Sequence, residues 1–125
     1  TEPFSAELNK KLESGLRRSQ GFDDSKERMY YTYWLAQGPH FETRAEVDAI
    51  GLLGGHMVGM TMAREVKLAN ELNIPYSAIC ISSNWAAGRE PGDRRAELSH
   101  QQVSAQANKR LEPVFQTLFN ILKDE

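Results

Sequence analysis

The sequence has little of what several classes of protein require. Its one cysteine, Cys80, stands in the apolar run Ile79–Ile81, so we expect a buried, reduced thiol and not a disulfide or a metal ligand. The formal net charge is −2 and the basic residues are scattered, which disfavours nucleic-acid binding. No apolar run approaches the roughly 20 residues that cross a bilayer, and the first residues lack the regions of a signal peptide. We therefore expect a cytoplasmic protein.

Two kinds of ligand motif are also missing. No cluster of histidine, cysteine and carboxylate side chains has the spacing of metal ligands. No glycine-rich loop of the P-loop or dinucleotide-binding kind occurs. These absences disfavour a bound metal ion and the common nucleotide-binding loops.

What is present is an alternation of helical and strand-like patterns. We expect helices over residues 3–18, 43–53, 61–73 and 99–122, and strands over residues 29–36, 57–60 and 74–81. Thr43 followed by Glu46 predicts a capping box, and Pro113 should kink or restart the last helix. The order predicts one layered α/β domain over residues 1–125, with a largely parallel or mixed central sheet.

Polar and aromatic residues follow each expected strand. Phe41 and Glu42 come after the first strand, Met60 and Thr61 after the second, and Asn84 after the third. Ligands of open α/β sheets bind at the carboxyl ends of the strands. The sequence therefore predicts a small-molecule site at this edge.

Each of these residues has a functional and a purely structural interpretation. Thr61 could hold an anion at a helix N-terminus or merely cap that helix. Phe41 could stack on a purine and Glu42 could accept its N–H groups, although a core ring and a first-turn acid explain them as well. Asn84 could read a purine edge or close a loop on itself.

Four motifs together resemble one family. They are GPHFETRAEV at residues 38–47, VGMTMAREVKLANELNIP at 58–75, ISSNWAAG at 81–88 and LSHQQV at 98–103. From Pro3 to Leu122 the chain is similar to the C-terminal half of the trimeric purine nucleoside phosphorylase family, which includes the methylthioadenosine and methylthioinosine phosphorylases.

The resemblance implies a pentosyltransferase of purine salvage with a layered α/β fold. Inorganic phosphate would be the co-substrate, attacking C1′ of the ribose while the purine leaves, and no metal or organic cofactor would be needed. The family's N-terminal half, which holds most of the phosphate site, has no counterpart here. Residues 1–125 would then form a partial domain, expected to be inactive alone, that needs a complementing N-terminal segment, in a homotrimer.

The resemblance also assigns roles at the base, sugar and phosphate. Phe41 would pack on the purine, and Glu42 would accept a hydrogen bond from the base N1–H. Met60 would lie against the sugar, and Thr61 would donate to phosphate.

Two further residues bear on catalysis and substrate choice. Asn84 would be catalytic, hydrogen-bonding the leaving base at N7 and O6, and asparagine favours 6-oxopurines where the methylthioadenosine branch has aspartate. His100 matches a histidine that meets the 5′-hydroxyl, so inosine or guanosine is preferred. Methylthioinosine or methylthioadenosine phosphorolysis stays an alternative, as does a non-catalytic purine-binding or interaction domain.

Overall fold

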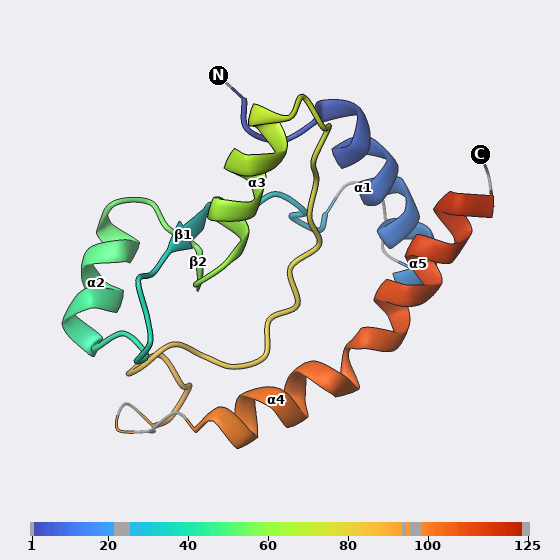
Figure 1. The fold of residues 1–125 in the computed structure, drawn as a ribbon. Coiled ribbons are helices and arrows are strands. Elements are labelled where there is room, and N and C mark those ends of the chain that lie inside the picture. The colour runs from blue at the N-terminus through green and yellow to red at the C-terminus, as the bar shows by residue number, and fades with distance from the viewer. Residues whose placement is uncertain (1, 22–25, 94, 96–98, 124–125) are drawn as a thin grey trace. The chain divides into compact units, whose positions relative to one another are not determined.

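The computed structural model describes residues 2–21, 26–93, 95 and 99–123, without the side chains of His100, Gln102, Gln106 and Lys109. Its elements are α1 (Ala6–Gln20), β1 (Tyr33–Leu35), α2 (Arg44–Leu52), β2 (Met57–Gly59), α3 (Met62–Glu71), α4 (His100–Lys109) and α5 (Leu111–Lys123), as Figure 1 shows. The chain divides into two compact units. Unit 1 comprises Thr1–Tyr30, Arg64–Cys80 and Arg110–Glu125, and unit 2 comprises Tyr31–Ala63 and Ile81–Lys109.

The two strands of the described residues form a parallel pair in unit 2. The register pairs Tyr33 with Met57, Trp34 with Val58 and Leu35 with Gly59. The Ala36 N–H donates to the Gly59 carbonyl at 2.9 Å, which carries the pairing to the strand ends. A parallel pair joined through a helix is the expected unit of an α/β fold, so this part of the sequence prediction is confirmed.

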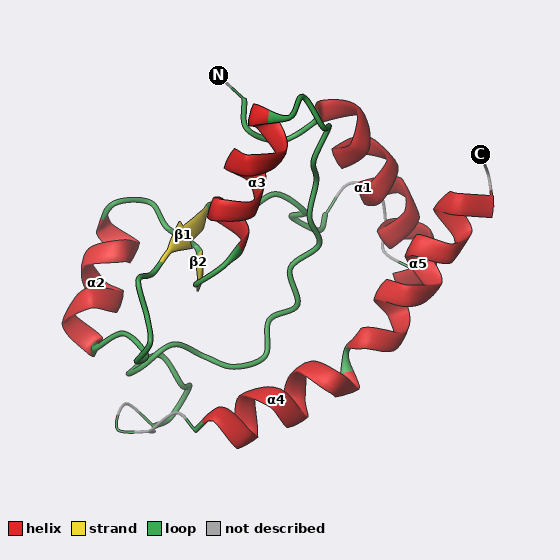
Figure 2. Ribbon diagram, in the orientation of Figure 1, coloured by secondary structure: helices red, strands yellow, loops and turns green. Residues whose placement is uncertain are grey.

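The prediction of a third strand, over residues 74–81, is wrong. Residues 74–83 pair with no strand of the described residues, and Figure 2 draws the chain that follows α3 as loop. The Ser5 N–H donates to the Tyr76 carbonyl at 2.8 Å, and the Tyr76 hydroxyl donates to Glu65 at 3.0 Å. A strand is defined by its neighbour, and the apolar run 74–81 has none within the described part of the chain.

Helix α2 begins as its sequence predicts. The Thr43 hydroxyl oxygen accepts the Glu46 N–H at 3.3 Å, and the Glu46 carboxylate accepts the Thr43 N–H at 2.6 Å. This reciprocal pair is the expected capping box. The helix ends before Gly54, whose φ of 90° terminates it.

The last expected helix is divided in two. Helix α4 ends at Lys109 and α5 begins at Leu111. Pro113 lies in the first turn of α5, where a helix needs no backbone N–H from it. The predicted restart near Pro113 is confirmed.

Helices α1 and α5 pack side by side in unit 1 (Figure 1). Gly15 lets them approach, because a Cβ added there would lie 2.9 Å from Cδ1 of Ile121 and 3.0 Å from Cγ2 of Thr117. One turn on, the hydroxyl oxygens of Ser19 and Thr117 are 2.6 Å apart, so the helices run antiparallel. Thr117 is fully buried by this contact.

Few apolar side chains are buried. Among the described residues, Ala36, Val47 and Val66 form the buried apolar set. Large apolar residues remain exposed on several elements: Tyr30, Tyr31, Leu52, Leu53, Leu68, Leu72, Ile74, Trp85, Phe115, Leu118, Phe119 and Leu122. The described part of the chain thus leaves much of its apolar surface uncovered.

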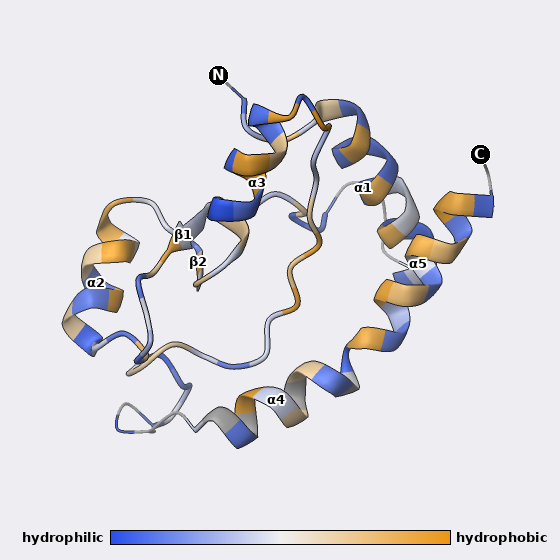
Figure 3. Ribbon diagram, viewed as in Figure 1, coloured by the Kyte–Doolittle hydropathy of each residue, from blue (hydrophilic) through white to orange (hydrophobic). Residues whose placement is uncertain are grey.

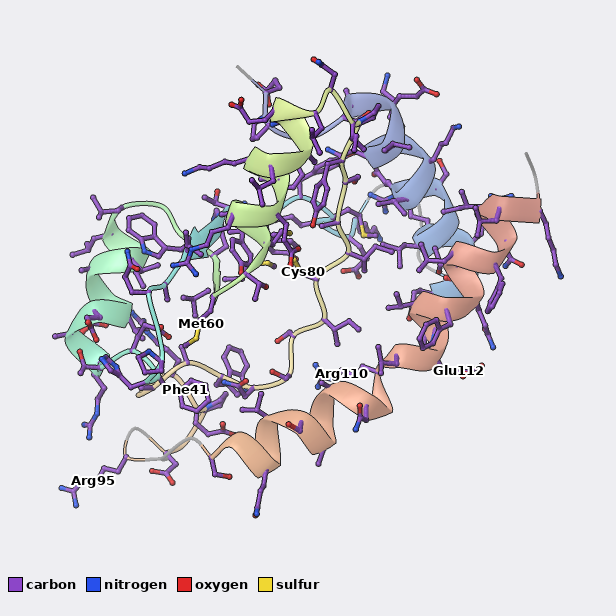
Figure 4. All side chains as sticks on the ribbon, viewed as in Figure 1. Phe41, Met60, Cys80, Arg95, Arg110 and Glu112 are labelled. Atoms are coloured by element: carbon purple, nitrogen blue, oxygen red, sulfur yellow. The ribbon has the colours of Figure 1, made fainter. Side chains whose placement is uncertain are left out.

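The expectation that Cys80 is buried is also wrong. The side chain, labelled in Figure 4, is exposed because the run around it is not covered as an inner strand would be. Neighbouring atoms still exclude part of the solvent, and this desolvation raises the pKa of the Cys80 thiol above its ordinary value.

Candidate functional site

The structure brings the ends of β1 and β2 to one edge. Because the strands are parallel and in register, the segments that follow them leave in the same direction. Phe41 and Glu42 follow β1 through a short loop, while Met60 and Thr61 follow β2 directly. All four residues belong to unit 2, and Figure 4 labels Phe41 and Met60 on these two segments.

Gly38 connects the two segments. Its φ of 66° suits glycine, and a Cβ added there would lie 2.9 Å from Sδ of Met60. The loop that leads to Phe41 therefore rests on the Met60 side chain. Met60 is partly buried, as is Phe41.

Glu42 takes no part in the capping box of α2. Thr43 is the N-cap and Glu46 completes the box, and the hydrogen bonds from the Thr43 backbone N–H and hydroxyl hold the pKa of Glu46 below its ordinary value. Glu42 stands one residue before the N-cap and is partly buried. Among the described residues, none hydrogen-bonds or ion-pairs with the Glu42 carboxylate. This carboxylate is therefore available for a ligand.

Thr61 directly precedes α3, the position the sequence predicts for it. Its backbone N–H donates to the hydroxyl oxygen of Tyr33 at 3.3 Å, and its side chain is exposed. Sequence reasoning missed Tyr33, whose only signal was a hydroxyl-bearing aromatic residue in a strand. The Thr61 hydroxyl and the later amides of the first turn are what this helix end offers to an anion.

Asn84 has the local arrangement that the sequence left open as an alternative. Its Oδ1 accepts from the Ser83 hydroxyl at 2.7 Å, and its Nδ2 donates to the Trp85 carbonyl at 2.7 Å. The side chain is exposed and closes the loop on itself. To read a base, Asn84 must exchange these two bonds for bonds to the ligand.

A second feature that the sequence did not reveal ties the Asn84 loop to α2. Arg89 donates to Asp48 of α2 at 2.7 Å. Both side chains are about half exposed or more, at 49% and 68%, so solvent weakens the ion pair. The pair still links the loop after Asn84 to the helix that follows Glu42, all within unit 2.

His100 is the remaining candidate residue of the site. His100 begins α4, but its side chain lies outside the described residues, so its role stays a prediction. Within the described ranges, no group of three or more His, Cys, Asp or Glu residues could hold a metal ion. None of the helices described there combines the length and the apolar character needed to cross a bilayer.

Several known proteins are similar in sequence to this chain. A probable 6-oxopurine nucleoside phosphorylase of Thermococcus kodakarensis is 41% identical over 106 residues, which covers 82% of this chain and 36% of the relative. The 6-oxopurine nucleoside phosphorylase of Pyrococcus furiosus is 36% identical over 114 residues, covering 91% and 40%. A probable S-methyl-5'-thioinosine phosphorylase of Methanopyrus kandleri is 43% identical over 96 residues, covering 76% and 35%.

This chain thus spans 35–40% of the length of these relatives. The family model of the Phosphorylase superfamily matches residues 1–120. The resemblance carried by the four sequence motifs is confirmed, and the chain belongs to the Phosphorylase superfamily.

Proposed function

We propose that this chain carries the base side of a nucleoside phosphorylase active site. The completed enzyme cleaves 6-oxopurine nucleosides with inorganic phosphate, giving the free base and ribose 1-phosphate. The observation that carries the proposal is the partly buried Glu42 carboxylate, which is unengaged within the described part of the chain and adjoins Phe41 in the loop after β1. Two relatives named 6-oxopurine nucleoside phosphorylases support the substrate class.

Each residue at the strand ends contacts a different part of the substrate. Phe41 stacks on the purine, and Glu42 accepts the N1–H that a 6-oxopurine carries. Met60, packed beside Gly38, lies against the sugar. Thr61 donates its hydroxyl to phosphate at the start of α3, where the helix dipole favours negative charge.

Asn84 stabilises the leaving base. In phosphorolysis the C1′–N9 bond breaks and its electron pair goes to the purine, while a phosphate oxygen bonds to C1′. An amide donor aimed at N7 meets that developing charge, and such a donor contributes roughly a hundredfold to a thousandfold in rate. Asn84 must first release Ser83 and Trp85, which hold it in this structure.

The 5′ position decides between two substrates. His100 against a 5′-hydroxyl favours inosine or guanosine. The 43% identity to a probable S-methyl-5'-thioinosine phosphorylase supports methylthioinosine as the second candidate. Both substrates present the same 6-oxopurine edge to Glu42 and Asn84.

The remaining part of the active site comes from outside this chain. The chain spans at most 40% of the three relatives, so we assign the other phosphate contacts to a complementing N-terminal segment. Phosphate is the co-substrate, without a cofactor. A homotrimer in the cytoplasm stays our prediction for the completed protein.

The test uses a chimera in which this chain replaces the matched 40% of the Pyrococcus furiosus relative. Hypoxanthine release from inosine is measured with and without phosphate, for the chimera and for the chain alone. The proposal predicts release by the chimera only when phosphate is present, and none by the chain alone. Purine binding by the chimera without release would instead support the non-catalytic alternative.

Two neighbouring glutamates give a matched pair of variants in the same chimera. Glu42→Gln should lower kcat/KM for inosine by about tenfold to a hundredfold, because an ionic acceptor for N1–H is lost. Glu46→Gln keeps an oxygen that can accept the Thr43 N–H and loses only the charge, so it should lower the Tm slightly and leave kcat/KM unchanged. Equal losses of kcat/KM for the two variants would contradict the role of Glu42.

A further inference from the structure

The loop that follows Asn84 lies against the start of α2. A Cβ added at Gly88 would lie 2.9 Å from both Cγ and Cδ of Arg44. The φ of Gly88 is 75°, in the left-handed region that favours glycine. Gly88 therefore lets the loop backbone rest directly on the Arg44 side chain, where a larger residue would displace one of the two.

An ion pair extends this contact along the same face of α2. Arg89 donates to Asp48 at 2.7 Å, and a Cβ added at Gly51 would lie 3.8 Å from the same nitrogen of Arg89. Arg44 and Asp48 are four positions apart, so they lie one turn apart on one face of the helix. The start of α2 is also more hydrophilic than its end, as Figure 3 shows. Two consecutive loop residues thus meet two successive turns of α2 in a polar contact within unit 2.

A turn within the loop carries this contact back toward Asn84. The Arg89 N–H donates to the Ala86 carbonyl at 2.9 Å, which closes a tight turn that begins two positions after Asn84. Glu42 stands two positions before Arg44. The contact on α2 therefore joins the two segments that carry Asn84 and Glu42.

We propose that this contact positions Asn84 for catalysis. By holding the loop on α2, it sets the spacing between the Asn84 amide and the Glu42 carboxylate. Gly88, Arg89 and Asp48 are then positioning residues, because they act through Asn84. The inference rests on the proposed function, in which both groups bind one purine. N7 and N1–H stand at fixed positions on a rigid ring, and a misplacement of about 1 Å can cost about a hundredfold in rate.

The close approach at Gly88 carries more of this contact than the ion pair does. Arg89 and Asp48 are exposed enough for solvent to weaken their attraction. Gly88, by contrast, meets carbon atoms in the middle of the Arg44 side chain, which must move as a whole to make room. The largest effect is therefore expected from a substitution at Gly88.

Two glycines of the same loop give a matched pair of variants. Gly88→Ala and Gly92→Ala place a side chain at φ values of 75° and 82°, but no atom of the described residues lies within 4 Å of the Cβ added at Gly92. In the chimera, Gly88→Ala should lower kcat for inosine about tenfold and leave KM within about twofold, because Phe41 and Glu42 still bind the base. Gly92→Ala should leave both constants within about twofold.

A second substitution separates the contact from backbone strain. Arg44→Ala removes the side chain that the new methyl group meets, so Gly88→Ala combined with Arg44→Ala should recover at least about threefold of the lost kcat. The strain of the positive φ at Gly88 remains in the double variant. A loop that is merely strained would therefore recover no activity.

Charge reversal tests the ion pair without a change of backbone. Asp48→Lys should lower kcat about threefold, and adding Arg89→Glu should restore kcat to within about twofold of the parent chimera. Lys11→Glu is the matched control. It breaks another exposed ion pair, with Glu7 of α1 at 3.6 Å, and should leave kcat unchanged.

The positioning role and the proposed function fail separately. Equal kcat values for Gly88→Ala and Gly92→Ala, in a parent chimera that releases hypoxanthine with phosphate, would overturn the positioning role and retain the function. If Gly88→Ala does not fold, failure of Arg89→Glu to restore the Asp48→Lys variant overturns it instead. A parent chimera without phosphate-dependent release would remove the proposed function, and the inference with it.

Discussion

Two strand-like segments of this chain lead to candidate site residues, and only one of them forms a strand. β1 pairs with β2 and leads to Phe41 and Glu42, which reach the strand edge with the Glu42 carboxylate available. Residues 74–81 also have an apolar sequence but no strand partner among the described residues, and they lead to an Asn84 that is bonded within its own loop. The difference teaches that the partner, and not the propensity, decides whether a strand forms and presents its site residue.

Completing the sheet should change one segment and not the other. We expect residues 74–81 to gain a neighbouring strand in the chimera, so their amide hydrogens should exchange at least about a hundredfold more slowly than in the isolated chain. Residues 33–35, already paired with β2, should change far less. Hydrogen-exchange mass spectrometry measures both segments in one experiment. Unchanged exchange at residues 74–81 would show that they are loop in the completed protein as well.

A substitution at Gly38 should destabilise the first of these segments, which runs from β1 to Glu42. Gly38→Ala combines a strained positive φ with overlap on Met60, so we expect a loss of roughly 1–3 kcal/mol in the free energy of unfolding. Gly21→Ala is the matched control, since its φ of 65° is the same within a degree and nothing lies within 4 Å of the added Cβ. Chemical denaturation measures the loss in the free energy of unfolding for each variant. Equal losses for Gly38→Ala and Gly21→Ala would mean that the Met60 side chain moves aside without an energetic cost.

A substitution at Asn84 in the chimera tests the second segment, residues 74–84. Asn84→Asp replaces a donor by an acceptor, so the preference should move from 6-oxopurine toward 6-aminopurine nucleosides. We expect the ratio of kcat/KM for inosine over adenosine to fall about tenfold or more. Competition assays with the two nucleosides measure that ratio. An unchanged ratio would leave Asn84 in the purely local role that it has here.

The smallest effect concerns the capping box of α2, which Thr43 and Glu46 form. Hydrogen bonds from Thr43 lower the pKa of Glu46 below its ordinary value of 4.5, so the ionised form stabilises the folded state above that value. This stability should be lost as the pH falls through the lowered pKa. In the Glu46→Gln variant the loss over that acidic window should be smaller, as thermal unfolding against pH would show. An identical pH profile for both proteins would contradict the contribution of Glu46.

What the sequence could predict was local. The capping box of Thr43 and Glu46, the end of α2 at Gly54 and the restart at Pro113 depend on residues within a few positions of one another. The β1–β2 pair was also predictable, because both strands and their connecting helix lie within 27 residues, Tyr33 to Gly59.

What the sequence could not predict depends on contacts between distant residues. The bond from Thr61 to Tyr33 spans 28 positions, and the pair of Arg89 with Asp48 spans 41. Neither has a spacing that periodicity can detect. The exposure of Cys80 was missed for a related reason, since an apolar run predicts burial only where something covers it.

The most direct test of the account is a crystal structure of the chimera with hypoxanthine and inorganic phosphate bound. The account predicts the base on Phe41 with its N1–H at the Glu42 carboxylate and the phosphate at the Thr61 hydroxyl. A base bound away from Glu42, or a phosphate with no contact to the start of α3, would contradict it.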